Sequence, residues 1–121
     1  MKKVMIVDDA ATVRMYHGDI LRQAGYDVVE AFNGVEALEK VLANPVDLML
    51  VDVNMPLMDG YSFLREVRMH NDTMHIPAIM ISTESEQSDR EKAYLNGAND
   101  YMIKPVRPDV LLEKVRLMIG G

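Results

Sequence analysis

The chain has 121 residues, a net charge of −6 and no cysteine. A chain of this length buries about two-thirds of the surface that its unfolded form exposes, so it needs no disulfide or metal to fold. Its Lys and Arg residues are dispersed and no apolar run approaches the ~20 residues that span a bilayer, so we expect one cytoplasmic domain over residues 1–121 that binds neither nucleic acid nor membrane.

Five short apolar runs predict five β-strands. They cover residues 4–7, 26–31, 48–51, 78–81 and 101–103. The first, third and fourth runs are apolar throughout, as expected of strands that are covered on both faces. The second run alternates between apolar and polar residues and the fifth is short. We therefore expect these two strands at the edges of the sheet.

Segments with helical spacing of apolar residues follow each of the five runs. Asn33 and Glu36 resemble a capping box at the start of the second helix, and Asp59 is the expected cap of the third. The apolar face of the second helix is expected to consist of Val35, Leu38, Val41 and Leu42. Strands that alternate with helices in this way predict an open α/β sheet, mostly or wholly parallel, with helices on both faces.

The fourth predicted helix, around residues 85–96, has a narrow apolar stripe. Its middle is charged, and its apolar residues are Ala93, Tyr94 and Leu95. A helix with so little apolar surface to bury should be held loosely against the sheet. It is the element that we expect to shift most easily.

Polar residues follow four of the predicted strands. Asp8 and Asp9 come after the first, Asp52 ends the third, Ser82 follows the fourth and Lys104 follows the fifth. Ligands of open α/β sheets bind beyond the carboxyl ends of the strands, so these side chains are expected to converge. Three neighbouring carboxylates repel one another unless a cation joins them, and hard oxygen ligands suit Mg²⁺ better than Zn²⁺. The set is suited to phosphoryl transfer.

The sequence resembles the response-regulator receiver domains of two-component signalling. The resemblance rests on V-M-I-V-D-D (residues 4–9), D-V-N-M-P-L-M-D-G (residues 52–60) and Y-M-I-K-P (residues 101–105), in that order. The stretch D-D-A-A-T-V-R (residues 8–14) is similar to single-domain chemotaxis response regulators. The resemblance implies a flavodoxin-like fold with five parallel strands in the order 2-1-3-4-5 and five helices.

The resemblance also implies a role for each residue of the site. Asp52 would be the phosphoacceptor, and Asp8 and Asp9 would hold Mg²⁺ together with Asp52 and the backbone carbonyl of Asn54. Lys104 would contact the phosphoryl group. Its peptide bond to Pro105 would be cis, which would shape the loop that aims the lysine.

A conformational switch is implied as well. The family's hydroxyl position falls on Ser82, although the neighbouring Thr83 also carries a hydroxyl, and Tyr101 matches an aromatic whose ring turns inward when that hydroxyl moves to the phosphate. Asn54 and Glu84 occupy the two positions that tune how long the phosphoryl group lasts. This pair predicts a short-lived phosphorylated state.

The partners implied are a histidine kinase, or a histidine phosphotransfer protein, and a downstream target protein. The target would read the surface formed by the fourth helix, fifth strand and fifth helix. We expect a phosphoacceptor that catalyses its own phosphorylation and dephosphorylation, not an enzyme with a separate substrate. Since no output domain follows Gly121, a diffusible messenger or relay is expected. It would be a monomer, with dimerisation on phosphorylation as the alternative.

Two other classes of function stay open from the residues. One is a receiver-like interaction module that is not controlled by phosphorylation, which the intact acids and Lys104 disfavour. The other is an enzyme on the same architecture. A flavin protein would need a phosphate-binding loop where Asp8 and Asp9 stand, and an aspartate-nucleophile phosphatase would need an acid where Asn54 stands.

Overall fold

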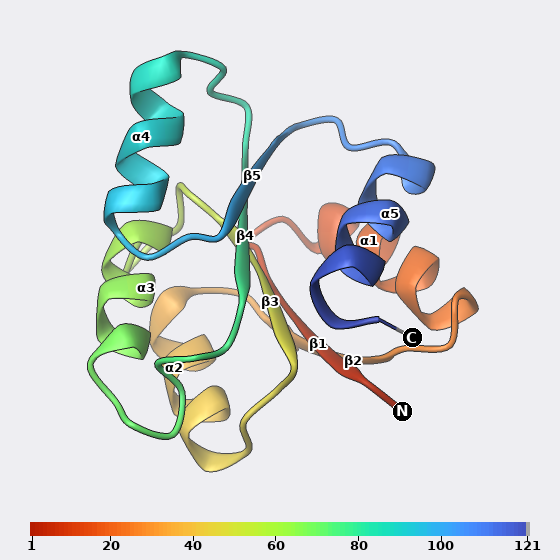
Figure 1. Ribbon diagram of the computed structural model, residues 1–121, viewed down its shortest axis with the longest axis horizontal. Helices are drawn as coiled ribbons and strands as arrows, with labels where there is room; N and C mark the ends of the chain where they lie inside the picture. Colours follow the sequence, from red (N-terminus) through yellow and green to blue (C-terminus); the bar gives the residue numbers. More distant parts are fainter. Residues whose placement is uncertain (121) are drawn as a thin grey trace.

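Strand and helix alternate five times in the computed structural model, which describes residues 1–120 (Figure 1). The strands are β1 (Lys3–Val7), β2 (Asp27–Ala31), β3 (Leu48–Asp52), β4 (Ala78–Ser82) and β5 (Asp100–Ile103). The helices are α1 (Ala11–Gln23), α2 (Gly34–Ala43), α3 (Gly60–Arg68), α4 (Gln87–Leu95) and α5 (Pro108–Ile119). All ten elements that the sequence predicted are present. None of the helices within residues 1–120 is long and apolar enough to cross a membrane.

The five strands form one parallel sheet in the order β2-β1-β3-β4-β5, which confirms the expected topology. Every residue of β3 and β4 is buried, whereas the edge strands β2 and β5 are partly exposed. The alternating second run and the short fifth run therefore identified the edges correctly. A strand covered by helices on both faces must be apolar at every position, which explains the central runs.

Helices cover the two faces of the sheet in unequal numbers (Figure 1). On one face α2, α3 and α4 pack over side chains such as Val7 and Val51. On the other face α1 and α5 pack over side chains such as Ile6 and Leu50. Because neighbouring residues of a strand point to opposite faces, each central strand contributes to both cores.

The start of α2 corrects two details of the prediction. Asn33 Oδ1 accepts a hydrogen bond from the Glu36 amide at 2.8 Å, as expected, but Glu36 Oε1 accepts from the amide of Phe32 instead of Asn33. The expected apolar face is also partly wrong. Ala37 and Val41 are buried, and Leu38 packs against them, but Val35 and Leu42 are each 39% exposed.

The rotation of α2 is set by a close contact at its first residue. A Cβ atom at Gly34 would lie 2.5 Å from the carbonyl oxygen of Met58, in the loop between β3 and α3. This approach fixes the first turn of α2 against that loop. Small Ala37 then faces the sheet, in a position that the count of large apolar residues could not predict.

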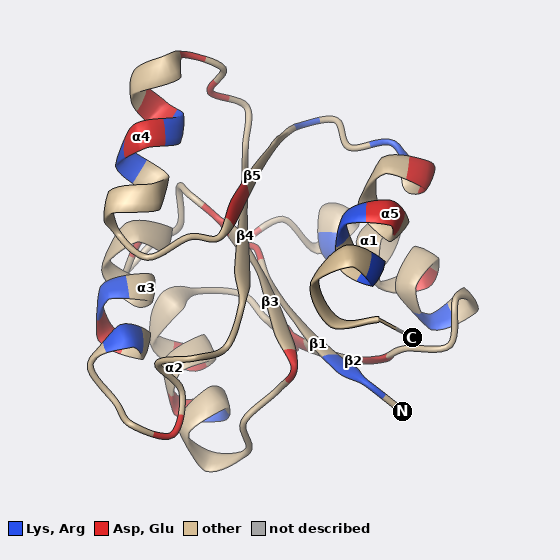
Figure 2. Ribbon diagram, viewed as in Figure 1, with Lys and Arg blue, Asp and Glu red and all other residues tan. Residues whose placement is uncertain are grey.

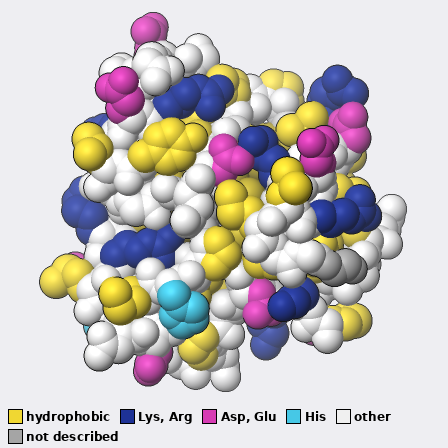
Figure 3. Space-filling view, viewed as in Figure 1, with side chains coloured by type: hydrophobic (Ala, Val, Ile, Leu, Met, Phe, Trp, Pro, Cys, Tyr) yellow, Lys and Arg dark blue, Asp and Glu magenta, His cyan; other side chains and the backbone are white. Residues whose placement is uncertain are grey.

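Helix α4 is weakly anchored, as the sequence predicted. Ala93 is its one buried residue, and acidic and basic residues follow each other along its ribbon in Figure 2. Two of its cations lie over aromatic rings: Lys92 Nζ is 4.6 Å from the ring centroid of Tyr61, and Arg90 Cζ is 5.3 Å from that of Tyr101. Such contacts are worth about 0.5–1 kcal/mol at exposed sites, less than burial of a large apolar side chain. Elsewhere on the face in Figure 3, Lys and Arg side chains are scattered among neutral and acidic ones.

We predict that Gly60→Ala destabilises the protein by about 1–3 kcal/mol. A Cβ atom at Gly60 would overlap the carbonyl oxygen of Asp52 and lie 2.7 Å from Met80 Cε. Gly18→Ala in α1 is the matched control, because its Cβ would meet the movable end of the Arg22 side chain at 3.0 Å. Alanine at position 18 should be neutral or stabilising by about 0.5–1 kcal/mol. Denaturant unfolding measures both, and equal effects of the two substitutions would contradict the close packing described here.

Candidate functional site

Four strands bring the predicted site residues to one edge of the sheet. Asp8 and Asp9 directly follow β1, and Asp52 is the last residue of β3. Val7 pairs with Val51 in the parallel register, so the residues after them lie side by side. Carboxylate oxygens of the three aspartates lie within 4.8 Å of one another, and no other group of three His, Cys, Asp or Glu residues does so within the described chain.

Lys104 bridges two of these carboxylates. Its Nζ donates to Asp8 Oδ2 at 2.9 Å and to Asp52 Oδ1 at 3.2 Å. The side chains are 18% exposed for Lys104, 4% for Asp8 and 9% for Asp52, so water screens the contacts only partly. The Lys104 amide donates to the carbonyl of Ser82 at 2.8 Å, and the Lys104–Pro105 peptide bond is cis, as expected.

The charge of the cluster is not balanced. Burial, and then the negative charge of Asp8, raise the pKa of Asp52 from 3.8 to about 6, although Lys104 opposes the shift. For Lys104, burial acts to lower the pKa, but the hydrogen bond that it donates to Asp8 and the charges of both aspartates outweigh burial and raise the pKa. One ammonium therefore faces three carboxylates. A hard dication with oxygen ligands fits this donor set, and Mg²⁺ is the ion that such a set favours.

The cluster is closed on the sheet side and open on the other. Asp9 is exposed, in contrast to Asp8 and Asp52, and Asn54 is exposed in the loop that follows β3. Further along that loop Leu57 has a φ angle of 69°, a left-handed conformation that costs a branched residue about 1–2 kcal/mol. The loop is thus held in a shape that its own sequence disfavours.

The residues predicted to form the switch both bond to the backbone of Glu84. Ser82 is 1% exposed and its Oγ accepts from the amide of Glu84 at 3.1 Å, whereas the neighbouring Thr83 is exposed. Tyr101 is 2% exposed and its hydroxyl donates to the carbonyl of Glu84 at 2.7 Å. Both side chains therefore hold the loop between β4 and α4, and the ring of Tyr101 lies inward.

Two residues near the cluster were not predicted as parts of the site. Arg14 Nη1 donates to the backbone carbonyl of Asp8 at 2.6 Å. His17 is buried, and burial lowers its pKa from 6.5, with Asp8 opposing and Lys104 reinforcing the shift. Together with Val13, His17 lines a pocket of about 320 Å³ that reaches Lys104. The one sequence signal for both residues is their place in the first two turns of the helix that follows the acidic pair.

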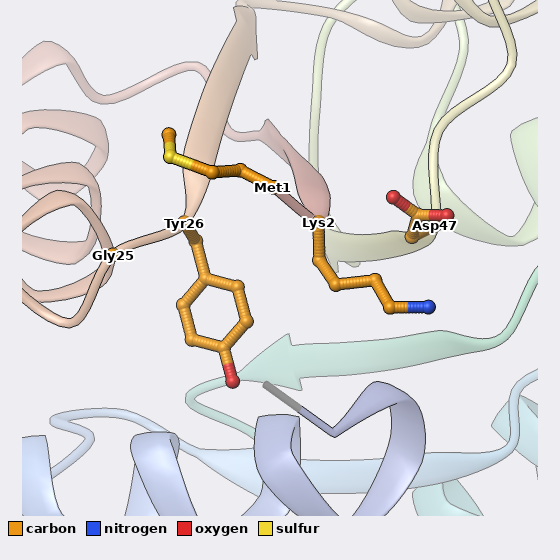
Figure 4. Close-up of a pocket in the computed structure, with 5 residues that line it drawn as sticks. All are labelled: Met1, Lys2, Gly25, Tyr26 and Asp47. Atoms are coloured by element: carbon orange, nitrogen blue, oxygen red, sulfur yellow. The ribbon is translucent and has the colours of Figure 1, made fainter.

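A separate pocket of about 520 Å³ lies at the opposite edge of the sheet (Figure 4). Residues that precede the strands line it: Met1, Lys2, Gly25, Tyr26 and Asp47. Lys2 and Asp47 are the charged side chains of this lining, which has neither the charge nor the donor set of the acidic cluster. The candidate functional site is therefore the acidic cluster at the carboxyl ends of the strands.

A doubly wound parallel sheet with three clustered aspartates and a lysine at its carboxyl edge defines a class of signalling domain. Residues 4–116 match the family model described as "Response regulator receiver domain", and the chain belongs to this family. It is 41% identical to chemotaxis protein CheY1 of Helicobacter pylori (strain J99) over 120 residues, which cover 98% of this chain and 97% of that protein.

Solved structures agree with this assignment. The chemotaxis response regulator CheY4 of Vibrio cholerae superposes with a TM-score of 0.93 at 35% identity, over 98% of each chain. The receiver domain of sensor histidine kinase PA1611 from Pseudomonas aeruginosa gives a TM-score of 0.92 at 29% identity, over 99% of this chain and 98% of that one. That structure has a magnesium ion coordinated in its active-site cleft.

The raised pKa of Asp52 predicts that Asp52→Asn stabilises the protein at neutral pH by about 1–3 kcal/mol. Because the folded-state pKa lies above that of the unfolded chain, the carboxyl destabilises the fold increasingly as the pH rises from 3.8 through about 6. The gain should therefore shrink as the pH is lowered to about 4. Adding Mg²⁺ should reduce the gain at neutral pH, since the cation relieves repulsion in the wild type.

Denaturant unfolding of both proteins over this pH range measures the effect. Asp72→Asn is the control, because Asp72 is exposed in the loop between α3 and β4. A wild type that is more stable than Asp52→Asn at neutral pH without Mg²⁺ would show that the carboxylates do not repel one another as described.

Proposed function

We propose that the protein accepts a phosphoryl group on Asp52 from a phosphohistidine of a histidine kinase or a histidine phosphotransfer protein. The observation that carries this proposal is the buried Asp52 carboxylate, which shares the ammonium of Lys104 with Asp8. An Asp52 oxygen would attack phosphorus while the donor's nitrogen–phosphorus bond breaks. The electron pair would leave with the imidazole, and an acyl phosphate would remain on Asp52.

Mg²⁺ would be held by Asp8, Asp9, Asp52 and the backbone carbonyl of Asn54. When bound, it supplies positive charge that neutralises the carboxylates and the oxygens of the phosphoryl group. The donor set and its unbalanced charge support this assignment, as does the magnesium ion in the PA1611 receiver domain. Lys104 would contact another oxygen of the phosphoryl group with the ammonium that now bridges Asp8 and Asp52.

Phosphorylation would be transmitted through the peptide of Glu84. The hydroxyl of Ser82 would leave the Glu84 amide to donate to the phosphoryl group, and the loop before α4 would rearrange. Tyr101 already lies inward, the position that the resemblance associates with the phosphorylated form. Helix α4 could follow the loop because Ala93 alone anchors it in the core.

A downstream target protein would read the resulting change on the surface of α4, β5 and α5. We place this exchange in the cytoplasm, with a protein target instead of nucleic acid or membrane. The protein would act as a monomer, with phosphorylation-dependent dimerisation as the alternative. Asn54 and Glu84 are both exposed beside the site, where their side chains could set the access of water to the acyl phosphate. They would give a short-lived signal through self-catalysed dephosphorylation.

We predict that acetyl phosphate with Mg²⁺ adds one phosphoryl group to the wild type and none to Asp52→Ala, because Asp52 is the proposed acceptor and lies beside Lys104. Intact-protein mass spectrometry measures the product, and EDTA added before the donor should prevent it. Asp72→Ala, an exposed aspartate, is the matched control and should be phosphorylated like the wild type. If neither the wild type nor the control gains mass, and beryllofluoride also fails to bind, the protein is an interaction module that works without phosphorylation.

The position of the switch hydroxyl gives a second prediction. With beryllofluoride bound, amide hydrogen exchange of the loop 83–86 should change in the wild type and in Thr83→Ala, but much less in Ser82→Ala. The reason is that buried Ser82 holds the Glu84 amide, whereas Thr83 is exposed. Loss of the response in Thr83→Ala with its retention in Ser82→Ala would assign the switch to Thr83 instead.

A further inference from the structure

We propose that Arg14 is a positioning residue that sets the place of Asp8 in the acidic cluster, and that Glu30 holds Arg14 for this purpose. The inference rests on the function proposed above. Arg14 lies in the first turns of α1, and its Nη1 donates to the backbone carbonyl of Asp8 at 2.6 Å. Its side chain is only 16% exposed. The contact is with the main chain of Asp8, so Arg14 acts on the site through Asp8.

Glu30, on the edge strand β2, gives the guanidinium a single orientation. Its Oε1 accepts from Arg14 Nε at 3.3 Å and its Oε2 accepts from Arg22 Nη2 at 3.2 Å. Its backbone carbonyl accepts from Lys40 Nζ at 2.6 Å. Both carboxylate oxygens and the main chain of Glu30 are therefore engaged. A planar guanidinium with one nitrogen on Glu30 and another on Asp8 has little freedom to turn.

The backbone of Asp8 is consequently held on both sides, by β2 directly and by Arg14 of α1. Its amide donates to the carbonyl of Ala31 at 3.1 Å, and its carbonyl accepts from Arg14. Its side chain is fixed as well, because Oδ1 accepts from the amide of Ala10 at 2.9 Å while Oδ2 faces Lys104. Loss of the Arg14 contact would remove the hydrogen bond that holds the carbonyl of Asp8. The Asp8 carboxylate would then move relative to Asp52.

Charge and position predict opposite effects for this residue. Arg14 carries a positive charge near the cluster, so if charge alone mattered, its removal would strengthen the binding of a cation. If it positions Asp8, its removal weakens binding, as happens when groups that orient metal ligands are lost. The direction of the change in Mg²⁺ affinity therefore separates the two roles.

The test is isothermal titration calorimetry of Mg²⁺ into the intact, unphosphorylated protein. Arg14→Met keeps most of the apolar stem, and we expect it to raise the Kd by about tenfold. Arg14→Lys keeps the charge and one donor nitrogen, so its Kd should lie between those of the wild type and Arg14→Met. Glu30→Gln should raise the Kd less than Arg14→Met. Arg116→Met is the control, because Arg116 is exposed near the end of α5, which lies against Tyr26 at the other edge of the sheet.

Thermal unfolding of each variant separates positioning from general destabilisation. An Arg14→Met protein that melts earlier but binds Mg²⁺ as tightly as the wild type, or more tightly, would overturn the inference. If Arg14→Met does not fold, Arg14→Lys decides because it keeps the positive charge, and an unchanged Kd for that variant overturns the inference. A wild type that binds no Mg²⁺ would overturn the proposed function together with the inference. If the wild type binds Mg²⁺ and Arg14→Met binds it with the same Kd, the inference is overturned but the proposed function is not.

Discussion

An excess of negative charge at the carboxyl ends of β1 and β3 is the constraint that the rest of the structure has to offset. Asp8 and Asp52 are buried there beside Asp9, and Lys104 balances only part of their charge. The cost appears as a pKa of about 6 for Asp52. A fold that holds such a cluster stores repulsion that a bound cation relieves. Because the same repulsion favours binding of a metal cation, the site suits a reaction in which that cation also neutralises an incoming phosphoryl group.

The parallel sheet is what makes this arrangement stable. The apolar runs of the central strands bury side chains on both faces, and this burial offsets the repulsion at the strand ends. The edge strand β2 contributes in another way. It holds the Asp8 peptide directly through Ala31 and indirectly through Glu30 and Arg14. The edge strand β2 thus helps to determine the position of the proposed metal ligands, together with the central strands β1 and β3.

Transmission of a signal from such a site requires an element that can move at a small cost in free energy. Ser82 bonds to the amide of Glu84 and Tyr101 to its carbonyl, so a change at the cluster reaches the loop before α4 in one step. Helix α4 has one buried residue, and Arg90 packs over the ring of Tyr101. Contacts of this kind are strong enough to place the helix and weak enough to be exchanged. In the proposed function, the buried strands position the reacting side chains and the weakly held helix α4 changes position in response.

Patterns local to the chain were enough to predict the five strands, both edges, the weak fourth helix and the meeting of Asp8, Asp52 and Lys104 at one edge of the sheet. They were enough for two reasons. The alternation of side chains along a strand can be read within a few residues, and the carboxyl ends of parallel strands lie at the same side of the sheet. The tertiary structure decided the rest. It turned Ala37 of α2 inward in place of Val35, through the close approach of Gly34 to Met58, and brought Arg14 onto Asp8 by way of Glu30. The contacts of Gly34 with Met58 and of Arg14 with Glu30 join separate elements of the chain, and their geometry depends on how helices pack, which no local periodicity encodes.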